Sequence, residues 1–133
     1  MLSMSNILTI GFGIAVSIAA SSIASADSDL AKEAEQAGVK IDLADEHNIA
    51  AGDTLFNKSC TLYCHGKDGT KNRAPSLRNR DDLTVRDLQY VISKGRKRAG
   101  KVMPAWRTRL KDEEIWQLVA YLVSLRDAGP VEK

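Results

Sequence analysis

Apolar residues near the C-terminus of the chain recur at intervals typical of an amphipathic helix. Acidic residues at 112–114 precede them, where the helix macrodipole favours negative charge, and Gly129-Pro130 follows as a stop signal. The periodic positions are Ile115, Leu118, Val119, Leu122 and Leu125. This stretch therefore predicts a helix with one buried face.

A second helix is predicted before the first cysteine of the chain. Asn48 is a suitable N-cap for a helix that runs toward Cys60. Gly52 and Phe56 lie at i and i+4, so they share one face of that helix. The pattern indicates packing of this face against another element.

A third helix is predicted between Thr84 and Gly95. Thr84 begins a Thr-x-x-Asp sequence that resembles a capping box with Asp in place of Glu, and Gly95 is suited to the C-terminal end. The segment 67–80 is polar and lacks helical periodicity, so it predicts a loop. Because no alternating strand pattern occurs, the predicted class is all-α.

The first 26 residues have the composition of a targeting segment. Residues 1–26 carry no charged side chain, residues 7–23 are mostly apolar, and Ala-Ser-Ala at 24–26 supplies a cleavage site. We interpret residues 1–26 as a secretory signal peptide, although its start lacks the usual Lys or Arg. The alternative is an uncleaved anchor, but seventeen residues are few for spanning a bilayer. Cleavage would leave a chain without stable membrane insertion.

Charge is distributed unevenly along the remainder. The net charge of the chain is +2, yet residues 27–50 carry −5 and residues 51–133 carry +7. We expect residues 27–47 to form a weakly ordered acidic extension, in which 29–38 has only a thin apolar stripe and is free to fold back. Residues 48–133 are then expected to form the single basic domain.

Two cysteines and a histidine form the most specific chemical pattern. Cys60 and Cys64 are the only cysteines, and His65 follows directly. The spacing Cys-x-x-Cys-His attaches c-type haem, with thioether bonds to both cysteines and iron bound by the histidine. Here three residues separate the cysteines, which departs from that spacing. The alternatives are a structural disulfide or half of a zinc site, but no further cysteine pair or suitable histidine completes four ligands.

Met103 supplies a second candidate iron ligand. Met1 and Met4 lie in the predicted signal peptide, so Met103 is the only thioether expected in the mature protein. His/Met ligation suits an electron carrier and raises the reduction potential of haem iron. Pro104 favours an extended backbone at Met103, as a ligand-bearing loop requires. The alternative is a core methionine that fills a gap, and the only rival ligand, His47, lies in the acidic extension.

These features together resemble a small class I monohaem cytochrome c, over roughly Asn48 to Ala128. The resemblance implies helices and loops wrapped around one haem c, which is covalently bound through Cys60 and Cys64. His65 and Met103 would be the iron ligands. The matching motifs are Gly52-x-x-x-Phe56-x-x-x-Cys60, the haem motif, Ala74-Pro75-Ser76-Leu77, Met103-Pro104-Ala105-Trp106 and Ile115 to Leu122.

The resemblance also implies further haem contacts. The backbone carbonyl of Pro75 would accept a hydrogen bond from the second ring nitrogen of His65 and orient the imidazole. Leu77 would pack against the porphyrin, and Trp106 would cover the haem near Met103. The alternatives are a plain turn role for Pro75 and plain packing for Trp106.

A six-coordinate haem has no open position for a substrate, and the chain shows no nucleophile–base pair, paired catalytic carboxylates or phosphate loop. We therefore expect a periplasmic one-electron carrier of a respiratory chain and no enzyme. A dehydrogenase would be the donor, with a PQQ-dependent alcohol dehydrogenase as one option, and a terminal oxidase the acceptor. Residues 94–101 hold five cations and form either a docking patch for acidic redox proteins or a solvated loop. We expect no nucleic-acid partner.

Two other functions remain open at this point. A five-coordinate haem enzyme or gas sensor would require Met103 to be unligated or easily displaced. A fixed cytochrome subunit of a larger oxidoreductase would be held in place by an uncleaved N-terminus.

Overall fold

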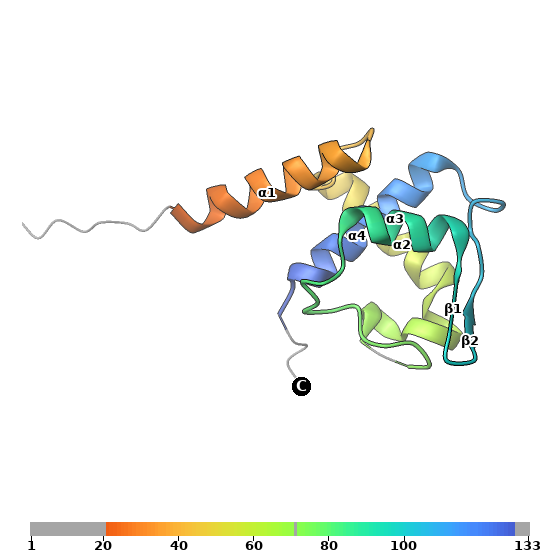
Figure 1. The fold of residues 1–133 in the computed structure, drawn as a ribbon. Coiled ribbons are helices and arrows are strands. Elements are labelled where there is room, and N and C mark those ends of the chain that lie inside the picture. The colour runs from red at the N-terminus through yellow and green to blue at the C-terminus, as the bar shows by residue number, and fades with distance from the viewer. Residues whose placement is uncertain (1–20, 71, 130–133) are drawn as a thin grey trace, which may run out of the picture.

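Helices make up most of the fold. The computed structural model describes residues 21–70 and 72–129. Figure 1 shows α2 and α3 beside α4, α1 extending away to one side, and a small hairpin and a long loop below the helices. In chain order the elements are α1 (Ser21–Ala37), α2 (Glu46–Ser59), the π-helical turn η1 (Thr61–His65), the 3₁₀ turn η2 (Lys67–Gly69), α3 (Val85–Lys94), β1 (Arg96–Arg98), β2 (Lys101–Met103) and α4 (Asp112–Asp127).

The core forms where α2 and α3 pack against α4. The contact between α2 and α4 is the most extensive between any two elements described, and it depends on Gly52. A Cβ atom at Gly52 would overlap the carbonyl group of Gln117 and lie 2.8 Å from Cβ of Tyr121. Phe56, one turn later, is 1% exposed. The prediction that this face packs closely against another element is confirmed.

The helix ends follow ordinary capping chemistry, with one correction. Asp45, and not Asn48, is the N-cap of α2, and its side chain accepts a hydrogen bond of 3.0 Å from the Asn48 backbone. The Asn48 side chain instead donates to the Asp42 carbonyl at 2.9 Å. Thr84 caps α3 as predicted, by accepting from Asp87 N at 3.1 Å, and Gly95 ends that helix with φ of 74°.

The acidic extension is better ordered than the sequence indicated. Helix α1 is longer than the expected 29–38, and it packs against α3. Residues 1–20 of the predicted signal peptide lie outside the described residues, whereas 21–26 form the start of α1. Within the described residues no helix is both long and apolar enough to cross a bilayer.

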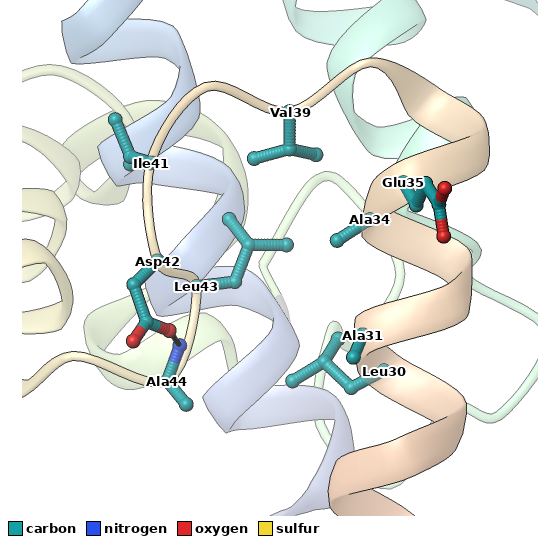
Figure 2. A pocket seen from close by; sticks show the side chains of 9 residues that line it. All are labelled: Leu30, Ala31, Ala34, Glu35, Val39, Ile41, Asp42, Leu43 and Ala44. Atoms are coloured by element: carbon teal, nitrogen blue, oxygen red, sulfur yellow. Dashed lines mark hydrogen bonds between the residues drawn. The ribbon is translucent and has the colours of Figure 1, made fainter.

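A groove separates α1 from the segment that follows it (Figure 2). Its volume is about 390 Å³. Leu30 and Ala34 face this space from α1, and Leu43 faces it from the opposite side (Figure 2). Leu43 is 4% exposed, so the extension contributes a side chain to the hydrophobic core. The complete lining is Leu30, Ala31, Ala34, Glu35, Val39, Ile41, Asp42, Leu43 and Ala44.

The basic segment 94–101 lies largely within a short β-hairpin, residues 96–103, which the sequence did not predict. β1 and β2 pair antiparallel, with Arg96 opposite Met103. The two turn residues, Ala99 and Gly100, both have positive φ, at 48° and 74°. This combination is typical of the type I′ turns that join short hairpins. The strands have three residues each and no apolar alternation, so the hydrophobic pattern carried no strand signal.

Candidate functional site

The extra residue between the cysteines is accommodated by a π-helical turn. An α-helical turn closes a hydrogen bond between residues i and i+4, the distance that separates the first Cys from His in Cys-x-x-Cys-His. Here His65 N–H donates to the Cys60 carbonyl at 3.1 Å, an i→i+5 bond, and Gly66 N–H donates to Thr61 in the same way. Such π-bulges add one residue to a helical turn. The three-residue spacer is therefore absorbed without breaking the turn.

Both cysteines are half-buried, and no disulfide joins them in the structure. Burial raises the pKa of Cys60 to about 11, and the nearby Cys64 adds to this effect. No group of three or more His, Cys, Asp or Glu side chains suited to a metal occurs in the described part of the chain. These observations do not support the disulfide and zinc alternatives.

His65 is held between the turn and the core. Its ring centre lies 5.9 Å from that of Phe56, and burial lowers its pKa, which favours the neutral imidazole. Its Nδ1 atom is buried and has no hydrogen-bond partner among the described residues. The expected hydrogen bond to the Pro75 carbonyl is thus not formed in this structure, where Pro75 is exposed. A buried imidazole nitrogen without a partner is costly, so this ring is suited to bind a further group.

The loop after η2 returns to the cysteine turn. Ala74 N–H donates to the Cys64 carbonyl at 2.8 Å, and Leu77 N–H donates to the Gly69 carbonyl at 2.9 Å. Leu77 is half-buried and packs against the hydrophobic core. The loop places Leu77 on the inner side and leaves Pro75 on the outer side.

Met103 lies at the end of β2, half-buried against the core. Trp106 is also half-buried there, and its backbone N–H donates to the Ile92 carbonyl at 2.9 Å. A Cβ atom at Gly95 would lie 2.6 Å from the Met103 carbonyl oxygen, so α3 and the Met103 segment approach closely only with glycine there. Met103 and Trp106 thus both pack against the hydrophobic core, as Cys60 and Leu77 also do.

A lysine links the hairpin to the cysteine turn, a contact that the sequence did not indicate. Lys101 Nζ donates to the Arg73 carbonyl at 2.5 Å, and the next residue, Ala74, bonds to Cys64. The hairpin and the cysteine turn therefore lie on the same side of the molecule (Figure 1). His47, the rival ligand, is exposed in the first turn of α2, at the end of that helix opposite Cys60.

The donor set of this region fits haem c. It combines two unpaired thiols on one turn, a neutral imidazole with an unpartnered nitrogen, and a half-buried thioether. These are the groups that attach and ligate a c-type haem.

Comparison with known proteins agrees with this chemistry. Residues 47–122 match the family model described as cytochrome c oxidase, cbb3-type, subunit III. The chain belongs to this family of c-type cytochromes. Its members carry covalently bound haem c, and Cys60 and Cys64 are the two cysteines available for the attachment.

Two curated relatives resemble part of this cytochrome. The cbb3-type cytochrome c oxidase subunit FixP of Rhizobium meliloti (strain 1021) is 35% identical over 82 residues, which cover 59% of the chain and 28% of FixP. FixP of Sinorhizobium medicae (strain WSM419) is 34% identical, with the same coverage. The cytochrome thus spans little more than a quarter of the length of these relatives.

The fold also resembles that of a solved cytochrome. Cytochrome CL from the marine methylotrophic bacterium Methylophaga aminisulfidivorans MPT superposes with a TM-score of 0.57 at 22% identity. The match covers 72% of the chain and 67% of that structure. The class I cytochrome c fold predicted from the sequence is confirmed.

Proposed function

We propose that this cytochrome is a periplasmic one-electron carrier whose haem iron is bound by His65 and Met103. One observation carries the proposal: the π turn holds Cys60, Cys64 and His65 together, while the hairpin that ends in Met103 is tied to the same side by Lys101. Bound haem c supplies reversible one-electron oxidation and reduction of its iron.

Each residue of the site has a distinct role in this proposal. Cys60 and Cys64 anchor the group covalently, and the neutral imidazole of His65 provides the first axial nitrogen. With haem bound, the Pro75 carbonyl would accept a hydrogen bond from the ring nitrogen of His65 that does not bind iron, and this bond would keep the ring oriented. Leu77 and Trp106 exclude water from the site. Exclusion of water makes the increase in charge that accompanies oxidation of the iron less favourable.

The partners are redox proteins that meet the cytochrome in the periplasm after cleavage at residue 26. The cationic hairpin favours acidic docking faces, because opposed charges raise the rate of encounter without requiring a large interface. A periplasmic dehydrogenase, such as a PQQ-dependent alcohol dehydrogenase, is the proposed donor, and a terminal oxidase is the proposed acceptor. The cytochrome itself performs no bond chemistry on a substrate.

A second candidate function is that of a fixed cytochrome subunit in a cbb3-type oxidase. The family match and the FixP relatives favour it. In that case the chain would remain with the oxidase during purification, whereas a mobile carrier would leave it at moderate salt.

The test is anaerobic stopped-flow reduction of the oxidised cytochrome by a substrate-loaded quinoprotein alcohol dehydrogenase, followed by reoxidation with a purified cbb3-type oxidase. Fast reactions that slow as salt rises support a mobile carrier with electrostatic docking. Reoxidation by the oxidase alone, with tight co-purification, would favour the subunit function instead. Failure with both proteins would reject these partners.

A further inference from the structure

The π turn presents two large apolar side chains to solvent. Leu62 is 76% exposed and Tyr63 is 72% exposed, although Cys60, Cys64 and His65 of the same turn are half-buried. Single apolar residues on a surface are common. Here, however, both occupy the spacer between the two cysteines that the family uses for haem attachment. Leu62 and Tyr63 therefore form the exposed apolar part of this turn.

Cationic residues flank this apolar pair in the sequence, and the first acid after it is Asp68. Lys58 precedes it and Lys67 follows it, both exposed, and no acidic residue lies between them. The link from Lys101 to the Arg73 carbonyl brings the hairpin to this side. The stretch between Asp87 and Asp112, which includes the hairpin, contains eight lysines and arginines and no acid.

We propose that Leu62 and Tyr63 form the apolar contact of a docking surface for an acidic redox protein, with the cationic hairpin as its polar border. The partner would present a small apolar area bordered by Asp and Glu. A second copy of this chain is disfavoured as the occupant, because its lysines would face like charges. The inference rests on the proposed carrier function and adds the residues that retain a partner once it has arrived.

Apolar and charged contacts affect docking differently, which makes the inference testable. Charges at the border mainly raise the association rate and lose their effect as salt screens them. A buried aromatic or aliphatic contact mainly slows dissociation and is insensitive to such screening. The hairpin and the π turn should therefore differ in how salt changes the effect of their substitution.

The experiment compares the haem-loaded double variant Leu62→Ser/Tyr63→Ser with the wild type. The concentration of cytochrome that half-saturates the reaction is measured with quinoprotein alcohol dehydrogenase and with cbb3-type oxidase. Each measurement is made at low salt and at about 1 M salt, where the screening length is about 3 Å. Each rate is divided by the rate with hexaammineruthenium, a small reagent that needs no docking surface. Tyr90→Ser is the matched control, since Tyr90 is 60% exposed on α3.

We expect the double variant to raise the half-saturating concentration about tenfold at both salt concentrations, equivalent to about 1.4 kcal/mol. Tyr90→Ser should change it less than twofold, and Lys97→Gln/Arg98→Gln should act at low salt only. Suppose that a partner reacts with the wild type and that the double variant changes the half-saturating concentration no more than Tyr90→Ser does. That result would overturn the inference and leave the carrier function intact. If the wild type reacts with neither protein, the partner assignment fails and the docking surface fails with it.

Discussion

Glu33 of α1 and Arg126 in the last turn of α4 form an ion pair of 3.2 Å, although 93 positions of sequence separate them. Their side chains are 26% and 12% exposed. The other carboxylate oxygen of Glu33 accepts from the backbone N–H of Val85, the first residue of α3, and Arg126 also donates to the Leu83 carbonyl at 3.1 Å. One carboxylate thus joins the acidic extension to both α3 and α4.

Replacing Glu33 with Gln should lower the free energy of unfolding by about 1.5–3 kcal/mol, since hydrogen bonds to charged groups contribute about that much. The amide retains the size of the side chain but removes its charge from Arg126 and from the N-terminal end of α3. Denaturant unfolding of the haem-loaded protein measures the effect. Glu35→Gln, an exposed acid on the same helix, should change stability by less than about 0.5 kcal/mol. Equal stability of the two variants would show that the extension is not clamped through Glu33.

Gly52→Ala should destabilise the crossing of α2 and α4. The higher helix propensity of Ala offsets only about 1 kcal/mol. An added Cβ would overlap the Gln117 carbonyl, and we expect a net loss of about 2 kcal/mol or more because the backbone must shift. Gly129→Ala is the control, since no atom lies within 4 Å of a Cβ there. Thermal unfolding measures the stability of both variants. If Gly52→Ala were as stable as the wild type, α2 and α4 could move apart to admit the Cβ atom without loss of stability.

The three helices of the haem domain were predictable because each has its own strong signal. The α4 segment has a regular apolar face, α3 lies between Thr84 and Gly95, and α2 includes Gly52 and Phe56 on one side. The N-cap of α2 was misplaced because Asp45 and Asn48 are both good capping residues. Tertiary context decides between them, since Asn48 is used to bind Asp42.

The missed features depend on contacts between distant segments or on local geometry. The apolar stripe of α1 is thin, and its packing is supported by Leu43 and by the ion pair of Glu33 with Arg126. The hydrophobic periodicity of the sequence cannot indicate either of these contacts. The π turn could not be predicted from the spacing alone, because an extra residue can also form a bulging loop. The link between Lys101 and Arg73 likewise uses a backbone carbonyl that no motif identifies.

Ala99 is the residue in the hairpin whose backbone conformation suits its side chain least. Its φ of 48° lies in the left-handed region, where a residue other than Gly costs about 1 kcal/mol or more. Ala99→Gly should therefore stabilise the protein by a net amount of about 0.5–1 kcal/mol. The greater chain entropy of Gly in the unfolded state offsets part of the relieved strain. Gly100→Ala, at φ of 74°, should have the opposite sign. Chemical denaturation of the two variants tests this pair, and the same sign for both would contradict a type I′ turn at the hairpin tip.

Replacing Met103 with Ala should leave the haem attached, because Cys60 and Cys64 are unchanged, but it should lower the reduction potential. In the proposed site, loss of the thioether would remove the ligand that raises the potential of His/Met haem iron, and the reduced protein should then bind carbon monoxide readily. Absorption spectra and a potentiometric titration provide the readouts. Val102→Ala is the matched control on the same strand, since Val102 is 61% exposed. If Met103→Ala has the same spectrum and reduction potential as Val102→Ala, Met103 is not an iron ligand. The five-coordinate alternative would then gain support only if the reduced wild type also binds carbon monoxide.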